Sequence, residues 1–482
     1  MVRSMKFNAV LNAVKQLLAV IFPLITVPYA SRILQKANYG KINFSSSIVN
    51  YIVLIAALGI STYAIREGAS IRNEKKKLSK FQNEVFTINI YSTLLSYLIL
   101  IALLMFSVSL KEYRLLMIIQ STSIVFTTLG ADWINSIHED YLFITVRYIV
   151  VQIISIICLF LFVKDTNDYV IYAMISTFSS VGGNVFNIIY IRKKYAHLRL
   201  VKECNFKKHM KPIMLLFCNA IAITIYVNSD TTILGFFKGD GAVGIYAIAA
   251  KLYTVVKQVL NAVVGITLPR FSSYVGQEDE NSFSKLLKKV LDAQIVILFP
   301  CIIGLFMLSK EAILLVAGME YSEGAVALRI LSVALGFAVL ACFYCNCILL
   351  PNKKEKICLI ASIISAIINI VLNFLAIPWL SFNGAALTTL ISEAVVFCIY
   401  WFYGRTIQRT QVSKKTIITT GLGCCFICLI CAVSKLLLDN YLLVIFVSVA
   451  LSGIIYVAIL ILFKNELIMS LLYNLKNKSK VS

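Results

Sequence analysis

The stretch RKKYAHLRLVKECNFKKHMK, residues 192–211, contains eight Lys and Arg residues and separates two long apolar parts of the chain. On both sides of it, apolar runs of about 20 residues recur with short polar breaks, and each run is long enough to cross ~30 Å of hydrocarbon as a helix. The 482-residue chain is 60% hydrophobic and 14% charged, with a mean hydropathy of +0.86. No soluble core needs so much apolar sequence, so we predict an all-α, polytopic integral membrane protein.

The pattern predicts fourteen transmembrane helices, six before residues 192–211, six between that segment and GRTIQRTQVSKK (404–415), and a terminal pair. Faint self-similarity between RILQKANYGKI (32–42) and ILGFFKGDGAVGIY (233–246), each with a glycine (Gly40, Gly244) opening the next helix, suggests two pseudo-symmetric lobes. We therefore expect an N-lobe over 1–200, a C-lobe over 201–405, and a helix pair with a basic tail over 406–482. The predicted spans are 9–34, 42–65, 83–106, 114–136, 141–163, 169–191, 212–236, 242–269, 290–308, 324–348, 356–378, 383–403, 416–437 and 441–463.

Orientation is predicted from Lys and Arg, because basic loops resist translocation and stay cytoplasmic. With the N-terminus inside, the even-numbered loops and both tails hold most of the 45 basic residues, so both termini are expected in the cytoplasm. Such loops beside anionic headgroups account for the net charge of +22 better than nucleic acid does. The opening MVRSMKFNAV lacks a cleavage site, so we expect no removed signal peptide. Most of the thirteen cysteines fall inside spans, and we expect no metal, cofactor or disulfide.

Polar residues inside the spans point to function. In YTVVKQVLNAVVGITLP (253–269), helical spacing places Lys257 on the same third of the helix as Lys251 just upstream. A cation at mid-span costs ~2.5–3.5 kcal/mol, so this stripe is expected to line a hydrated cavity and face an anion. The first span has a similar stripe, and two arginines are further candidates for the anion. The predicted site comprises the cations Lys15, Arg32, Arg147, Lys251 and Lys257, and the polar lining Asn8, Asn12, Thr254, Gln258 and Asn261.

Lys435 and Arg329 lie near span ends and are expected to snorkel to the interface. Three carboxylates, Asp132, Asp230 and Glu393, are candidates for ion coupling. Asp132 and Arg147 should lie at similar depths, which leaves a structural ion pair and a role in transport both open.

Glu393 in mid-span is either a coupling residue or a neutral acid that links helices. His138, His197 and His209 fall in predicted cytoplasmic loops, where we expect a solvated basic surface rather than catalysis. No extramembranous segment is long enough to fold as a catalytic domain, so we do not expect an enzyme.

Several stretches together resemble one known family. They are FPLITVPYASRIL with YGKINF (22–44), ALGISTYAIREGA (57–69), DTTILGFF with GAVGIYAIAAKL (230–252), ITLPRFS (266–272), LLPNKKEK (349–356) and NIVLNFLAIPWLSFNGAALTTLISE (369–393). The sequence resembles the bacterial oligosaccharide flippases, which export O-antigen and capsule repeat units. These belong to the multidrug, oligosaccharidyl-lipid and polysaccharide exporter superfamily.

This resemblance implies two six-helix lobes around a central cavity, plus a terminal pair that offers a groove to a lipid tail. It also implies a protein of the bacterial cytoplasmic membrane that moves undecaprenyl-pyrophosphate-linked oligosaccharide to the outer leaflet by alternating access. Its partners would be that lipid, the bilayer and polysaccharide polymerases, and nothing requires more than a monomer.

Three alternatives stay open. A cation-coupled multidrug antiporter would favour a cavity dominated by carboxylates, whereas the embedded charge here leans positive. Charge does not exclude a peptidoglycan-precursor (lipid II) flippase. A non-transporting scaffold for cell-wall enzymes would not need deep lysines.

Overall fold

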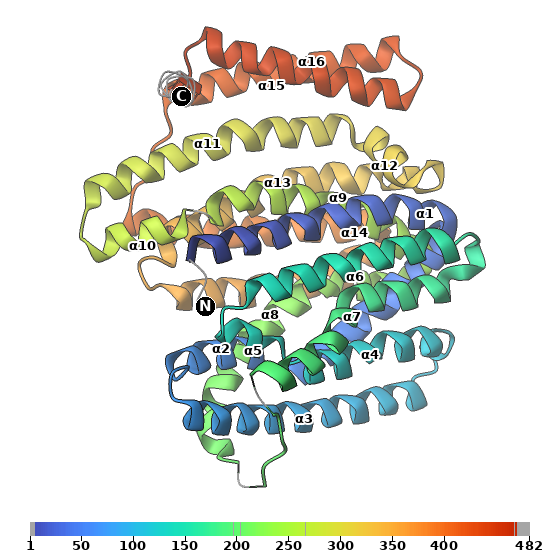
Figure 1. Cartoon of the computed structure of the whole chain (residues 1–482). Helices are drawn as coiled ribbons and strands as arrows, with labels where there is room; N and C mark the ends of the chain where they lie inside the picture. The colour runs from blue at the N-terminus through green and yellow to red at the C-terminus, as the bar shows by residue number, and fades with distance from the viewer. Residues whose placement is uncertain (1–4, 196, 203, 266, 467, 470–482) are drawn as a thin grey trace. The chain divides into compact units, whose positions relative to one another are not determined.

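The computed structural model describes residues 5–195, 197–202, 204–265, 267–466 and 468–469, and includes their side chains except at 5–10, 12, 13 and 263. All regular secondary structure within these residues is helical (Figure 1), as predicted. The contacts within the chain divide it into two compact units, Met1–Gly244 and Ile245–Ser482, called unit 1 and unit 2 below. The predicted lobe boundary at residue 200 lies before α8, which the contacts assign to unit 1, and the three-part division stays a prediction.

Unit 1 packs around the long first helix, which contacts α3, α4, α6 and α8. Its helices are α1 (Met5–Ala57), α2 (Ile60–Ser70), α3 (Lys75–Phe106), α4 (Arg114–Gly130), α5 (Asp132–Ile137), α6 (Tyr141–Phe162), α7 (Tyr169–Lys194), α8 (Phe206–Lys238) and the first turn of α9 (Asp240–Gly265).

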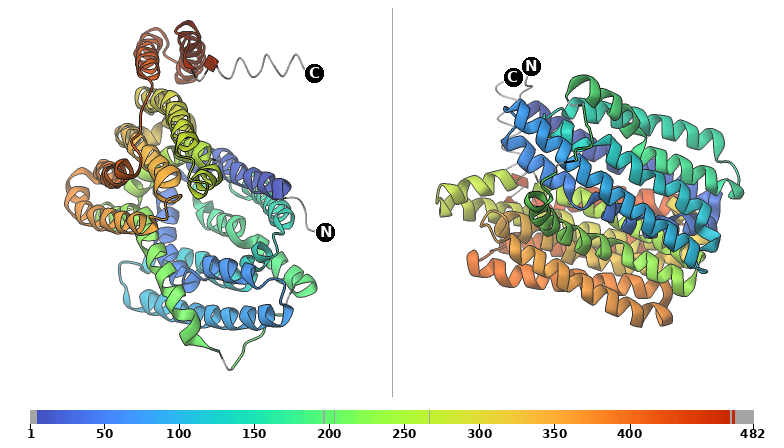
Figure 2. Two further views of the ribbon diagram at one scale, coloured as in Figure 1. Left: turned by 90° about the vertical axis from the view of Figure 1, so that its left-hand side faces the viewer. Right: turned by 90° about the horizontal axis from the view of Figure 1, so that it is seen from below.

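Unit 2 holds the rest of α9 and the helices that follow it. In this unit α13 packs on α14, and α11 contacts both α13 and α15. The last two helices, α15 and α16, lie side by side in Figure 1 and in the left view of Figure 2. The bounds are α10 (Leu268–Gly276), α11 (Glu280–Met307), α12 (Ser309–Ala317), α13 (Ala325–Tyr344), α14 (Glu355–Ile407), α15 (Lys414–Leu437) and α16 (Tyr441–Leu462).

Among the described residues, 11 helical segments are long and apolar enough to cross a membrane. Two helices, α1 and α14, are each 53 residues long, which is ~80 Å at 1.5 Å per residue and more than twice the hydrocarbon thickness. Each changes direction at one residue with positive φ, Gln35 (61°) in α1 and Ser381 (53°) in α14. These bends fall in the predicted breaks between spans, so each long helix has the length of two crossings.

The span predicted over 114–136 is helical but is interrupted near its end. Helix α4 ends at Gly130, Ala131 takes a left-handed conformation with φ 42°, and the short α5 begins at Asp132. The break is held by Asn187 of α7, which donates a hydrogen bond to the carbonyl of Gly130 at 2.5 Å. It places Asp132 at the start of a helix rather than inside one.

The outer faces of the spanning helices are apolar. Large side chains such as Leu98, Met105, Leu215 and Val227 are exposed, and many others share this exposure along the described helices. In water an apolar surface of this extent would drive association, whereas lipid tails are its natural neighbours. The chain is therefore a multi-pass membrane protein.

One histidine contradicts the sequence-based expectation. His209, predicted on a solvated surface, has 0% exposure within a cluster formed by α2, α3, α5 and α8. Its Nε2 lies 2.8 Å from Glu84 Oε2 and its Nδ1 lies 2.7 Å from the hydroxyl of Tyr63. The sequence prediction failed because one face of the first turns of α8, with His209 and Ile213, packs into this cluster, while the lysines on the other face stay exposed. His197 is exposed, and His138 is half-buried with its ring stacked on Tyr195.

Gly40 and Gly244, the two glycines of the faint repeat, lie at one close crossing within unit 1. A Cβ at Gly40 would collide with the carbonyl of Asp240, and a Cβ at Gly244 would collide with the carbonyl of Lys36. The two backbones can approach this closely only because neither residue has a side chain.

Candidate functional site

One cluster of charged side chains in unit 1 is centred on Arg147 of α6. Its Nη2 donates to both carboxylate oxygens of Asp132, at 2.7 and 2.9 Å, and Asn187 of α7 also donates to Asp132 at 2.9 Å. The Arg147 side chain is 8% exposed, whereas that of Asp132 is 46% exposed. The structure thus contains the ion pair that the sequence suggested, and its carboxylate is open on one side.

One nitrogen of the Arg147 guanidinium group has no partner in this cluster. Arg147 Nη1 is buried and makes no hydrogen bond within the described residues. Lys15 of α1 lies near the cluster, with its Nζ 5.9 Å from the ring centroid of Tyr148, and the charges of Asp132 and Arg147 both act on it. Gly183 provides the room, since a Cβ there would lie 3.0 Å from Arg147 Nε. The local charge, two cations to one carboxylate, suits an anion.

A second ion pair lies in unit 2, between α9 and α14. Lys257 Nζ is 2.5 Å from Glu393 Oε1, and the hydroxyl of Tyr253 donates to the same oxygen at 2.9 Å. Glu393 is 6% exposed and Lys257 is 27% exposed. The sequence left open a coupling role for Glu393 and a link between helices. In the structure Glu393 links α14 to α9, and its partner there is the ammonium group of Lys257.

Lys251, two turns before Lys257 on α9, differs from it. Lys251 is half-buried, and within the described residues it has neither a hydrogen bond nor an ion pair. Among its predicted stripe partners, Thr254 donates to the carbonyl of Ala250 at 2.7 Å, Gln258 is exposed, and the Asn261 amide oxygen is buried without a partner among the described residues. The stripe thus holds a cation and an amide whose polar atoms remain available.

The other predicted site residues are not brought into these two ion pairs. Arg32 is exposed on α1, and Asp230 is buried in α8, where its charge acts on Tyr51. Asn8 and Asn12 fall on α1, but their side chains lie outside the described residues.

Lys435 and Arg329, which are expected to snorkel, also have protein partners. Lys435 donates to the carbonyl of Met307 at 2.6 Å and pairs with Glu311 at 2.9 Å. Arg329 donates to the hydroxyl of Ser309 at 3.0 Å. The snorkelling of both side chains stays a prediction.

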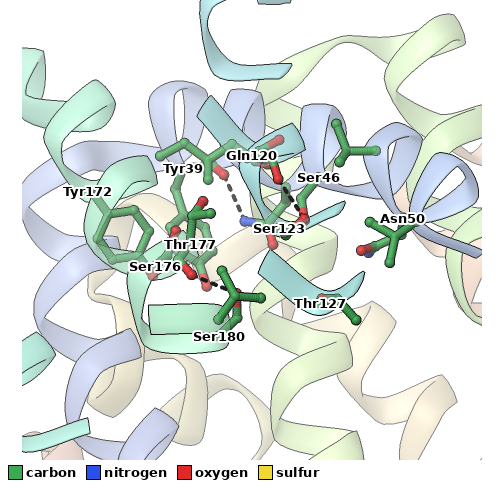
Figure 3. Close-up of a pocket in the computed structure, with 15 residues that line it drawn as sticks. Tyr39, Ser46, Asn50, Gln120, Ser123, Thr127, Tyr172, Ser176, Thr177 and Ser180 are labelled. Carbon is green, nitrogen blue, oxygen red and sulfur yellow. Dashed lines mark hydrogen bonds between the residues drawn. The ribbon is translucent and has the colours of Figure 1, made fainter. Parts of the chain in front are cut away.

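Sequence reasoning missed a polar cavity within unit 1, of about 380 Å³. Its volume falls in the ~300–1,000 Å³ range of small-molecule sites. Figure 3 shows side chains of α1, α4 and α7 around one space. None of the fifteen described residues that line it carries a charged side chain. The polar ones are Tyr39, Asn43, Ser46 and Asn50 of α1, Gln120, Ser123 and Thr127 of α4, and Tyr172, Ser176, Thr177 and Ser180 of α7.

These polar residues recur at helical spacings, three to four residues apart along each helix, which is the signal that could have revealed them.

The cavity also has a polar neighbour. A smaller cavity of about 70 Å³ shares Val53 and Thr127 with it and is lined by Asp132 and Trp133. Thr127 therefore lies between the uncharged cavity and the carboxylate that pairs with Arg147.

Unit 2 contains a cavity of the opposite character, of about 390 Å³, among α11, α12, α15 and α16. Its walls are formed by apolar side chains such as Leu305, Leu315, Ile427 and Val449. Such a surface suits a hydrocarbon chain and offers little to a charged ligand. Among the described residues, no group of three or more His, Cys, Asp or Glu side chains is arranged to hold a metal ion.

Comparison with known proteins agrees with this membrane fold. The chain is 24% identical over 383 residues to a putative O-antigen transporter of Shigella dysenteriae, covering 78% of this chain and 94% of the relative. It is 22% identical over 417 residues to the capsular polysaccharide biosynthesis protein CapF of Staphylococcus aureus, covering 84% and 100%.

Solved structures share the fold. The lipid II flippase MurJ in an inward closed conformation matches 95% of this chain and 100% of its own, with a TM-score of 0.76 and 17% identity. An inward-facing multidrug resistance transporter of the MATE family matches 80% of this chain and 97% of its own, with a TM-score of 0.56 and 12% identity. At these identities the likeness concerns the fold alone.

The relatives and the shared fold confirm the resemblance to the oligosaccharide flippases of the exporter superfamily. A model of the family described as polysaccharide biosynthesis protein matches residues 6–275, more than half of the chain. The residues of the Arg147 cluster, the polar cavity and Lys251 all lie within that range, and the chain belongs to the polysaccharide biosynthesis protein family.

Proposed function

We propose that the protein is a flippase that moves polyprenyl-pyrophosphate-linked oligosaccharide from the inner to the outer leaflet of the bacterial cytoplasmic membrane. It does so by alternating access, with fourteen spans and both termini in the cytoplasm. The relatives named as O-antigen transporter and capsular polysaccharide biosynthesis protein support the substrate class. The observation that carries the proposal is Lys251, a half-buried cation of a spanning helix with no partner among the described residues.

A cation in a spanning helix is retained against its desolvation cost only if something compensates it. Lys257 and Lys435 are compensated by carboxylates, whereas Lys251 is not. A pyrophosphate that enters during transport supplies the missing charge. Lys15 and the buried Nη1 of Arg147 offer a second cationic place in unit 1. Arg32 is a further candidate for the same pyrophosphate, and Lys257 becomes one only in a conformation that releases it from Glu393, with Asp132, Asp230 and Glu393 as candidates for ion coupling.

The substrate's hydrocarbon tail needs a different surface from its headgroup. The apolar cavity among α11, α12, α15 and α16 fits part of a polyprenyl chain, because its lining offers many apolar contacts and few unpaired polar atoms. This matches the groove that the resemblance implies for the terminal helix pair. A monomeric state and polymerase partners stay predictions.

The test uses cells depleted of this protein, in which lipid-linked oligosaccharide should accumulate in the membrane. Wild type should clear the intermediate and Lys251→Ala should not, while Lys251→Arg keeps the charge and should restore much of the clearance. Lys238→Ala removes an exposed lysine at the end of α8 and is the matched control.

Each alternative gives a different result in the same cells. Clearance by Lys251→Ala at the wild-type rate would contradict the anion site. No accumulation on depletion, together with increased drug sensitivity, would favour the multidrug antiporter. Accumulation of the peptidoglycan precursor instead would favour the lipid II flippase, and normal lipid intermediates with disordered wall synthesis would favour a scaffold.

A further inference from the structure

Several hydroxyl groups that line the polar cavity of unit 1 already donate a hydrogen bond to the helix backbone, while their oxygens can still accept one. Ser123 donates its hydroxyl hydrogen to the carbonyl of Gln120 at 2.6 Å, Thr177 donates to Ala173 at 2.7 Å, and Ser180 donates to Thr177 at 2.8 Å. Each hydroxyl has one donor and two acceptor lone pairs. Once the donor is bound to the helix backbone, the oxygen faces the cavity only as an acceptor.

Gln120 extends the same pattern and is among the most buried polar residues of the wall. Its Nε2 donates to the carbonyl of Ile42 at 3.1 Å, and its Oε1 is buried with no partner among the described residues. The residue is 6% exposed, and Figure 3 shows it in the wall of the cavity. A buried acceptor without a donor costs free energy, so this oxygen points to a ligand that donates a hydrogen bond.

Two further hydroxyls, those of Ser46 and Thr127, line the cavity and have no hydrogen bond within the described residues. Tyr39 and Tyr172 form part of one wall, with ring centroids 6.3 Å apart and planes tilted by 42°. Their rings offer apolar faces beside polar atoms, which suits a ligand that has both C–H and O–H groups.

The charge of the lining limits the ligand further. No charged side chain is among the fifteen described lining residues, so a phosphate or carboxylate placed here would be desolvated without a counter-charge. An uncharged ligand with many hydroxyl groups matches this wall, because Gln120 Oε1 and the backbone-bonded hydroxyls accept while Ser46 and Thr127 can both donate and accept. The shared wall at Thr127 connects this cavity to Asp132, so it lies next to the Arg147 cluster that we assigned to the pyrophosphate.

We propose that this cavity binds uncharged sugar residues of the translocated lipid, which donate hydroxyl hydrogen bonds to Gln120 Oε1 and to the oxygens of Ser46, Thr127 and the backbone-bonded serines and threonines. This assignment rests on the flippase function proposed above. It gives the protein a subsite that distinguishes the glycan from the pyrophosphate and the hydrocarbon tail.

The experiment compares three lipids binding to the full-length protein in nanodiscs, measured by native mass spectrometry. The first is the lipid-linked oligosaccharide that accumulates in flippase-depleted cells. The second is the same lipid with its glycan hydroxyls methylated, and the third is undecaprenyl pyrophosphate without a glycan. Methylation keeps the ring and its oxygens but removes the donors, so it tests the proposed direction of the hydrogen bonds.

The variants are Gln120→Met and Thr127→Val, which keep the side-chain volume and remove an acceptor each. Thr127→Val breaks no hydrogen bond within the described residues, so it keeps the test meaningful if Gln120→Met folds poorly. Gln152→Leu is the matched control, because Gln152 exchanges hydrogen bonds with Ser179 and does not line the cavity.

Wild type should bind the native glycan lipid about tenfold or more tightly than the methylated lipid or the bare pyrophosphate. Each cavity variant should lose about two- to tenfold of that preference, the amount expected for one hydrogen bond, and should bind undecaprenyl pyrophosphate as wild type does. Gln152→Leu should keep the preference.

The two proposals fail in different ways. If wild type binds all three lipids equally, or if both cavity variants keep the full preference, the sugar subsite is wrong while the flippase function stands. If depleted cells accumulate no glycan lipid, or if wild type binds none of the three lipids, the proposed function is wrong and the subsite falls with it.

Discussion

The ammonium group of Lys251 has no carboxylate beside it among the described residues, whereas that of Lys257, on the same helix, touches Glu393. Sequence spacing placed both on one face and treated them alike. Their partners decide their properties, because a paired cation is part of the packing and an unpaired one must meet water or a ligand. The two lysines therefore have different expected phenotypes.

Replacing Lys257 should affect stability first. In Lys257→Met, Glu393 keeps only the hydrogen bond from Tyr253 at its buried oxygen, and we expect a loss of about 1–3 kcal/mol in the free energy of unfolding. The double variant Lys257→Met, Glu393→Gln removes both charges and should recover part of that loss. Thermal unfolding of the purified variants measures these losses of stability. A double variant whose loss exceeds the summed losses of the two single variants would contradict a structural pair.

Asp140, between α5 and α6, gives a pH dependence outside the spans. Burial alone would raise the pKa of its carboxyl, but hydrogen bonds from Lys194, Tyr190 and Tyr195 outweigh it and lower the pKa to about 2. A pKa below the unfolded value means that the ionised form stabilises the fold at pH above about 4, and that this stability is lost as pH falls toward 2. The gap in unfolding midpoint between wild type and Asp140→Asn should therefore shrink from pH 5 to pH 2, and a constant gap would contradict it.

Sequence reasoning could single out the charged candidate residues because each charge in a spanning helix is costly and stands out. It could not find which of them pair, since Lys257 and Glu393 are 136 residues apart and their contact depends on how α9 packs on α14. It also missed Gln120 and Thr127. A neutral amide or hydroxyl in a helix can bond to the backbone at little cost, so its presence in a span does not by itself indicate a site. Only the packing of α1, α4 and α7 brings these polar stripes together.

At the scale of the elements, single residues set where helices bend or stop. The long apolar runs predicted the helices, and the polar breaks predicted the bends at Gln35 and Ser381. The break at Ala131 lies between Gly130 and Asp132, residues that can end and begin a helix, but the predicted span runs through them. It forms because Asn187, on another helix, takes the carbonyl of Gly130, which is information the local sequence does not hold.

The glycine crossing of α1 and α9 can be tested directly. Gly244→Ala should push the backbones apart and cost about 1–3 kcal/mol of stability, as overpacked sites do. Gly241→Ala is the matched control, because no atom lies within 4 Å of the Cβ it would add. Comparison of the unfolding midpoints of the two variants is the test, and Gly244→Ala should unfold at the lower midpoint. Equal midpoints would mean that the close approach is not required.

At the scale of the whole molecule, the distribution of Lys and Arg predicts the orientation. A fluorescent protein fused to the C-terminus should fold and fluoresce, because that end is expected in the cytoplasm, and alkaline phosphatase at the same place should be inactive. Phosphatase fused after Thr166, in a loop expected outside, should be active. The reverse pattern would overturn the orientation, and two reporters on the same side of the membrane would contradict the number of spans between them.

The most direct test of transport uses the purified chain alone in liposomes that contain the lipid-linked oligosaccharide from depleted cells. Added periodate oxidises only the sugars in the outer leaflet, because the bilayer is impermeable to periodate. We predict that with wild-type protein the inner-leaflet sugars also become oxidised over time, and that Lys251→Ala slows this at least tenfold. Sugars that stay protected at the level of protein-free liposomes would contradict the proposal that this chain is a flippase.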